Sequence, residues 1–200
     1  MNSPRSFRTT ELAKEFARQG HEVTVLIPKK KEHKEFEEKH NLTIKDLGQP
    51  TWQQIELKGS GIPLLFRRAV RRFSNLLFEY PDIQLVSMVE KALKKEEQTY
   101  DLLISIAVPH PIHWGVAKVW NKNSKNNPAK LWIADCGDPY MDKENDTFTP
   151  PFYFGWVEKW FMRKADYITV PVETAIPAYY PEFHDKIRVI PQGFKFEEIR

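Results

Sequence analysis

The chain has 200 residues, 41% of them hydrophobic, and a formal net charge of +3, which excludes a multidomain machine, a disordered polymer and a fibrous repeat. This charge is too small to indicate a nucleic-acid partner. The only cysteine, Cys136, cannot form an internal disulfide, which favours a reducing compartment. Because Met1 is not followed by a signal-peptide pattern and no apolar run could span a bilayer, we expect a cytoplasmic protein.

Strand and helix patterns alternate along the chain, as is typical of a parallel sheet covered by helices on both faces. The expected elements are, in chain order, a helix up to Gly20, a strand over 21–27, a solvated helical face over 29–39, a short or edge strand over 52–57, helices over 62–78 and 82–98, a strand over 101–106, a helix from Pro111, a strand over 131–134, a helix over 153–164, a strand over 167–170, a helix over 173–180 and a strand over 187–190. This order predicts a Rossmann-like α/β fold.

Both ends differ from those of a complete doubly wound domain. Residues 1–8 hold no apolar run, so the first strand of such a fold is expected to be missing. We expect one Rossmann-like domain over residues 1–200, with a helical excursion over about 58–98. A sheet without its first strand would have unpaired edges, and these favour self-association.

Six short segments follow one another in a characteristic order and spacing: Pro4–Ala13, Gly20–Val25, Pro109–His113, Asp135–Tyr140, Lys164–Val170 and Arg188–Gly193. Together they resemble the N-terminal domain of bacterial family 4 glycosyltransferases. The resemblance implies the GT-B architecture, in which the N-terminal domain mainly holds the acceptor and the C-terminal domain mainly holds the nucleotide-sugar. It also implies a retaining, metal-independent transfer of a sugar to a cell-surface glycan or a lipid-linked acceptor.

The sequence also departs from the family pattern. The paired glutamates that hold the donor lie in the family's C-terminal domain, and this chain contains none of that motif. The isolated chain is therefore expected to lack turnover, because transfer needs donor and acceptor held together. In the Asp135–Tyr140 loop, Cys136, Gly137 and Tyr140 replace the residues that the resemblance leads us to expect, which would alter acceptor choice. A non-catalytic binding module, or one subunit of a split transferase, is the alternative function.

Two loops follow strands at the edge where open α/β sheets bind ligands. His110 and His113 stand at the start of a helix, where free amides favour an anion such as a phosphate, and histidine can also move a proton. The carboxylate of Asp138 could accept a proton from an acceptor hydroxyl or stabilise positive character at the sugar carbon. We therefore assign His110 and Asp138 as candidate catalytic residues, and His113, Asp135 and Tyr140 as candidate acceptor contacts. The alternative is that these residues only form turns and helix starts.

Arg5 and Arg8 flank the start of the first helix, and a guanidinium fork suits phosphate. They are further candidate acceptor contacts, with a solvated N-terminal turn as the alternative. No Asp-x-Asp motif follows a strand, and no cysteine and histidine residues have zinc-ligand spacing, so we expect no metal. The expected ligands are a nucleotide-sugar donor and a glycan or lipid-linked acceptor, with no resident cofactor and no nucleic acid.

Residues 62–78 form a basic amphipathic pattern. On a helical wheel the apolar side chains fill one arc, whereas Arg67, Arg68, Arg71 and Arg72 fill the other. No acidic residue occurs between Lys58 and Phe78. Such a helix can lie on an anionic membrane, which would place the protein peripherally on the inner face of the plasma membrane. The alternative is that its apolar face packs into the protein's own core.

Overall fold

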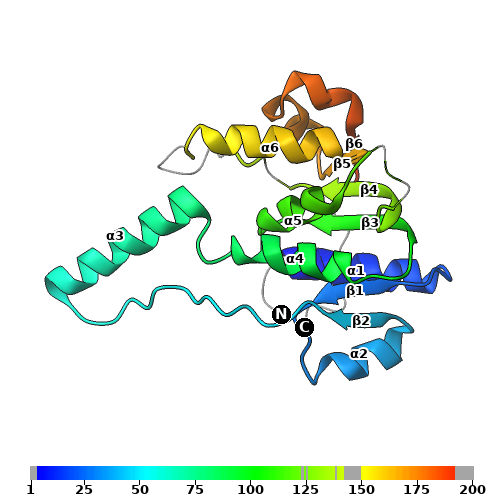
Figure 1. Cartoon of the computed structure of the whole chain (residues 1–200), viewed down its shortest axis with the longest axis horizontal. Coiled ribbons are helices and arrows are strands. Elements are labelled where there is room, and N and C mark those ends of the chain that lie inside the picture. The colour runs from blue at the N-terminus through cyan, green and yellow to red at the C-terminus, as the bar shows by residue number, and fades with distance from the viewer. Residues whose placement is uncertain (1–3, 123, 125, 138, 142–149, 192–200) are drawn as a thin grey trace. The chain divides into compact units, whose positions relative to one another are not determined.

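The structure is a computed structural model that describes residues 4–122, 124, 126–137, 139–141 and 150–191, with side chains described from residue 7 onward. It confirms an α/β fold in which parallel strands are flanked by helices (Figure 1). The described chain forms two compact units, which divide after Gln49, and the second unit covers Pro50–Val189. The strands make two parallel sheets, one with two strands and one with four.

The first unit is built from two helices and two strands. They are α1 (Pro4–Arg18), β1 (Thr24–Ile27), α2 (His33–His40) and β2 (Thr43–Asp46). The strands β1 and β2 pair in parallel from Thr24 opposite Thr43 to Ile27 opposite Asp46. Ala13, Leu42 and Ile44 form the buried core of this unit. In helix α2 only His33 is buried, in agreement with the solvated helical face predicted for residues 29–39.

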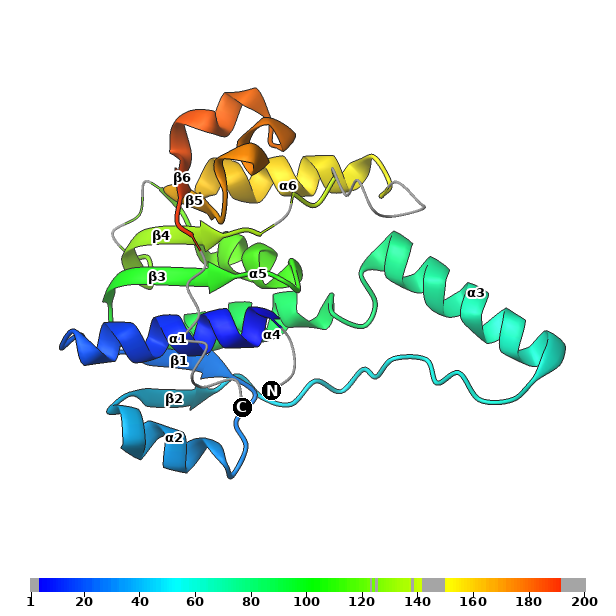
Figure 2. The ribbon, with the colours of Figure 1, turned by 180° about the vertical axis from the view of Figure 1, so that it is seen from behind.

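The second unit contains a four-stranded parallel sheet in the order β3-β4-β5-β6. Its elements are α3 (Gly61–Phe78), α4 (Gln84–Lys94), β3 (Tyr100–Ile106), α5 (Pro111–Val119), β4 (Ala129–Asp135), α6 (Tyr153–Lys164), β5 (Tyr167–Val170), two 3₁₀ helices, η1 (Glu173–Ala178) and η2 (Pro181–Lys186), and β6 (Ile187–Val189). Figure 2 shows the four strands side by side from behind. Because all of them run in parallel, their carboxyl ends lie at one edge of the sheet.

Two lysines cap the ends of helices in this unit. The Nζ atom of Lys164 donates to the carbonyls of Ala117 (2.6 Å) and Trp120 (2.9 Å) at the end of α5. The Nζ atom of Lys186 donates to the carbonyl of Ala165 (3.0 Å), just after α6, and burial lowers the pKa of this lysine to about 8. Cations at these positions also complement the negative end of the helix dipole. Both contacts hold the helices that cover the sheet.

Some elements differ from the sequence-based expectation. Residues 52–57 form no strand; instead the Gln84 side chain accepts from the amides of Thr51 (2.8 Å) and Trp52 (2.9 Å), as a partner strand would. The predicted helix over 173–180 is the 3₁₀ helix η1, because Pro177 cannot donate an α-helical hydrogen bond. The helix predicted over 82–98 is shorter and covers Gln84–Lys94.

Candidate functional site

The carboxyl edge of the four-stranded sheet brings four of the predicted site residues together. His110 precedes α5 and His113 lies in its first turn, whereas Asp135 ends β4 and Tyr140 follows in the next loop. The ring of His110 meets the ring of Tyr140 edge-on, with 4.9 Å between centroids, and lies 6.4 Å from the ring of His113. The two loops are also joined through the backbone, because the amide of Ala107 donates to the carbonyl of Asp135 (3.1 Å).

His113 is held from both ring nitrogens in the interior of the unit. Its Nδ1 atom lies 2.7 Å from Oγ of Ser105, and its Nε2 atom lies 3.5 Å from Sγ of Cys136. The Ser105 oxygen also accepts from Nε1 of Trp132 (2.8 Å). The Ser105 hydroxyl therefore joins the indole of Trp132 to the His113 ring. The ring is fully buried and stacks on Phe161, so it links β3, β4, α5 and α6.

Asp135 and Tyr140 are anchored by residues from later elements. Asp135 is buried, and its Oδ1 atom accepts from the hydroxyl of Thr169 on β5 (2.5 Å). The amide of Tyr140 donates to Oε1 of the buried Glu158 on α6 (2.7 Å), and its hydroxyl donates to Oε1 of Glu79 (2.5 Å). Burial, together with the Glu79 carboxylate, raises the pKa of the Tyr140 phenol. The phenol therefore stays protonated and remains a hydrogen-bond donor.

Glu79 and Glu158 were not predicted as site residues, although Glu158 had a signal in the sequence. It lies four residues from Phe154 and three from Phe161 on α6, and all three side chains are buried. A carboxylate on the apolar face of a helix must be paired, because burying it alone is costly. The hydroxyl of Tyr180 donates to its second oxygen (3.0 Å). Glu79 has no comparable signal, because it follows α3 at a turn with φ of 52°.

The remaining predicted site residues are Asp138, Arg5, Arg8 and the four arginines within 62–78. Asp138 falls outside the described residues, and so does the side chain of Arg5. Arg8 is buried in the first unit, whereas the two histidines belong to the second. Among the residues that the structure describes, no three side chains of the His, Cys, Asp and Glu types converge as metal ligands would. The substrate roles assigned to all of these residues, and the absence of a metal, stay predictions.

The fold and this edge can be compared with known proteins. The chain matches the sequence model of Glycosyltransferase Family 4 over residues 7–198. It belongs to glycosyltransferase family 4. This match confirms the resemblance drawn from the short segments, and at a coarse level it supports sugar transfer as the activity. Comparisons of this family 4 domain with curated proteins and with solved structures found no match.

Helix α3 gives this family 4 domain a second candidate surface. Figure 1 shows it extending away from the helices that cover the β3–β6 sheet. None of its residues is buried, and the side chains of Leu65, Phe66 and Phe73 are 62%, 69% and 59% exposed. The apolar face is therefore not enclosed among the residues that the structure describes, and its contact with a membrane stays a prediction. The four arginines on the other arc are exposed as well. Within the described part of the chain, no helix has the length and hydropathy to cross a bilayer.

Proposed function

We propose that the chain is the acceptor-binding part of a retaining glycosyltransferase, which moves a sugar from a nucleotide-sugar to a lipid-linked acceptor at an anionic membrane surface. The observation that carries this proposal is the exposed apolar face of α3, which lies beside a basic face in a chain of family 4. A cell-surface glycan without a lipid would give that face nothing to contact. The donor would be held mainly by a separate donor-binding domain.

The basic arc of α3 supports binding to an anionic membrane. Arg67, Arg68, Arg71 and Arg72 are all exposed, and each arginine near such a surface contributes about 1 kcal/mol. The apolar arc would enter the boundary between headgroups and acyl chains. Two exposed aromatic side chains, Phe152 and Trp156 at the start of α6, are 72% and 67% exposed and suit the same boundary. This surface would place the protein peripherally on the inner face of the membrane.

Vesicle binding tests the membrane part of the proposal. Replacing the four arginines of α3 by Gln should weaken binding to phosphatidylglycerol vesicles by up to about a thousandfold, because about 4 kcal/mol is lost and 1.4 kcal/mol is a factor of ten. Binding of the unmodified chain should fall as salt rises, since the Debye length at physiological strength is about 8 Å. Co-sedimentation at several salt concentrations measures both effects.

A matched variant separates local charge from net charge. The first unit has four exposed lysines, Lys30, Lys31, Lys34 and Lys39. Replacing them by Gln removes as many positive charges as the α3 variant loses. This control should bind phosphatidylglycerol vesicles much more tightly than the α3 variant. Equal losses in the two variants, or an unmodified chain that ignores these vesicles at low salt, would contradict a membrane role for α3.

The candidate catalytic residues support the chemical part of the proposal. His110 lies against Tyr140 at the carboxyl edge and is buried, as are His113 and Asp135, whose side chains position the two loops. In this assignment Asp138 accepts the proton of the acceptor hydroxyl and His110 assists proton movement. His110→Ala and Asp138→Asn, assayed together with a donor-binding domain, should each lower turnover by about 10²- to 10⁴-fold and leave donor binding nearly unchanged. Wild-type kinetics in both variants would leave these residues as turn formers.

A further inference from the structure

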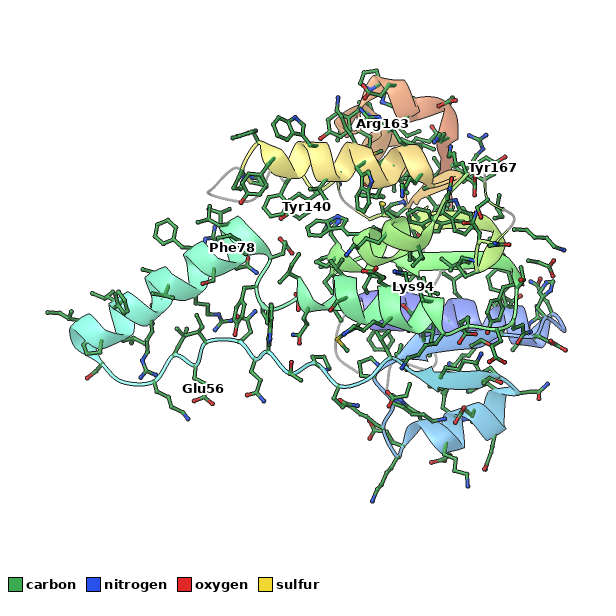
Figure 3. The ribbon with its side chains drawn as sticks, in the orientation of Figure 1. Glu56, Phe78, Lys94, Tyr140, Arg163 and Tyr167 are labelled. Atoms are coloured by element: carbon green, nitrogen blue, oxygen red, sulfur yellow. The ribbon has the colours of Figure 1, made fainter. Side chains whose placement is uncertain are left out.

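The second unit contains an apolar cavity that the catalytic assignment does not use. Its volume is about 680 Å³, within the range of small-molecule sites. The lining residues come from α3, the turn before α4, α5, α6 and the coil that precedes α3: Trp52, Ser74, Leu77, Phe78, Tyr80, Ile83, Trp114, Tyr153, Phe154 and Val157. None of these side chains carries a charge. In Figure 3, Phe78 is labelled at the end of α3 that lies toward α6.

The walls of this cavity are built from paired aromatic rings. Trp52 stacks on Tyr80, with 5.8 Å between ring centroids, and Trp114 stacks on Phe154 at 5.7 Å. The hydroxyl of Tyr153 donates to the carbonyl of Leu77, which joins α6 to the end of α3 beside the cavity. These contacts connect the elements that surround the cavity and keep its walls in place.

Two hydroxyl groups beside the cavity are already engaged. The hydroxyl of Ser74 donates to the carbonyl of Val70 within α3 (2.7 Å), and the hydroxyl of Tyr153 donates to Leu77. A polar or charged ligand group would lose its hydration here without gaining a charged partner. A hydrocarbon chain loses nothing of this kind, and each methylene removed from water favours binding. The lining therefore selects an aliphatic group.

The neighbouring charges on α3 indicate what that aliphatic group is attached to. Arg67, Arg71, Ser74 and Phe78 follow one another at spacings of four, three and four residues, so they form one row along the helix. Ser74 and Phe78 line the cavity, and Arg71 stands one turn before Ser74, about 4.5 Å along the axis at 1.5 Å per residue. Arg67 lies one turn further. A ligand with its chain in the cavity would therefore present its head to two guanidinium groups, which suit phosphate.

We propose that this cavity binds one hydrocarbon chain of an anionic lipid, whose phosphate is held by Arg71 and Arg67. The proposal deepens the proposed function, on which it rests, by naming the lipid part of the acceptor. It commits to a lipid drawn from the membrane surface that α3 contacts. The sugar-bearing end of such an acceptor would lie beyond the phosphate.

Dodecyl phosphate, used below its micelle concentration, is a soluble probe for this site. Calorimetry should show that the unmodified chain binds it, but binds inorganic phosphate and uncharged dodecyl maltoside at least tenfold more weakly. Val157→Phe and Ser74→Phe place a ring into the cavity from α6 and from α3, and each should weaken dodecyl phosphate binding at least tenfold. Arg71→Gln should weaken it by a similar factor.

Val172→Phe is the matched control, because Val172 is 51% exposed and does not line the cavity. This variant should bind dodecyl phosphate like the unmodified chain. Wild-type affinity in both cavity-filling variants, with their helix content confirmed by circular dichroism, would overturn the proposal. So would the absence of dodecyl phosphate binding by the unmodified chain. A chain that binds phosphatidylglycerol vesicles through α3 but not dodecyl phosphate would overturn the cavity site alone and leave the proposed function standing.

Discussion

Gly115 allows the close approach of α5 to α4, and replacing it by alanine should destabilise the second unit. A Cβ atom built at this position would lie 2.6 Å from Cβ of Val89 and 2.9 Å from the carbonyl oxygen of Val86. Both of these atoms are fixed to the backbone of α4, so no change of side-chain rotamer can relieve the contact. The two helices must move apart instead, and α5 carries His113 and Trp114.

The expected size of this effect is the difference between two terms. Overpacking of this kind costs about 1–3 kcal/mol, whereas exchanging glycine for alanine within a helix recovers about 0.5–1 kcal/mol. At the middle of these ranges Gly115→Ala should lower the free energy of unfolding by about 1 kcal/mol, which corresponds to a fall in Tm of about 2–4 °C for a chain of this length. Thermal unfolding followed by circular dichroism measures the shift.

Gly155→Ala in α6 is a matched control for this prediction. The nearest atom to a Cβ there is the hydroxyl oxygen of Tyr180 at 3.3 Å, which belongs to the end of a side chain and can move by a few tenths of an ångström. The helix propensity of alanine then offsets this small adjustment, so the Tm should change by less than about 2 °C. A Gly115→Ala variant as stable as the Gly155→Ala variant would refute the close approach of α4 and α5.

Two further predictions concern the same unit. Hydrogen bonds from Lys118 and Lys94 lower the pKa of Glu90 from 4.5 to about 2, so the stability that Glu90 adds to the fold is complete above about pH 4.5 and is lost as the pH falls toward 2. Lys118→Met should therefore make the Tm fall less steeply with pH in that range. An unchanged slope would contradict the pairing of Glu90 with Lys118. Ser105→Ala leaves the buried N–H of Trp132 without this acceptor and should lower the free energy of unfolding by about 1–3 kcal/mol in urea denaturation, whereas Trp132→Phe with Ser105→Ala should cost less than the sum of the single changes.

Elements with an uninterrupted hydrophobic pattern could be predicted closely. The helix over 153–164 and the strand over 167–170 agree with α6 and β5 at both ends, because the apolar pattern of each element runs along its whole length. The strand β2 was missed, since only Ile44 of its four residues is buried and its pairing depends on β1 and on the Glu37 carboxylate, which accepts from the Ile44 amide (2.6 Å). Residues 52–57 form no strand, and no local pattern reveals that Gln84, more than 30 residues later, bonds to the backbone of Thr51 and Trp52.

The position of the candidate site could be predicted, but its enclosure could not. Strand ends and the helix start at Pro111 place the two histidines at the carboxyl edge, because that placement needs only the order of elements. Burial of His113 and Asp135 depends on Phe161 and Thr169, which are 48 and 34 residues away in the chain. Such contacts arise from packing between elements, so a single sequence gives the residue types and not their accessibility.

The apolar arc of α3 shows most directly what a hydrophobic pattern leaves open. The same periodicity is typical of a helix packed on its own core and of one that rests on another apolar phase. Most helical stability in proteins comes from packing of an amphipathic face, and α3 has no buried residue to provide it. The charge of α3 distinguishes a core helix from a membrane-bound one better than its hydropathy does. A core helix needs no excess of positive charge, whereas four arginines without an acidic residue suit an anionic surface. Contact with that surface would supply packing along α3, whose last turn at Leu77 and Phe78 already meets α6 beside the cavity.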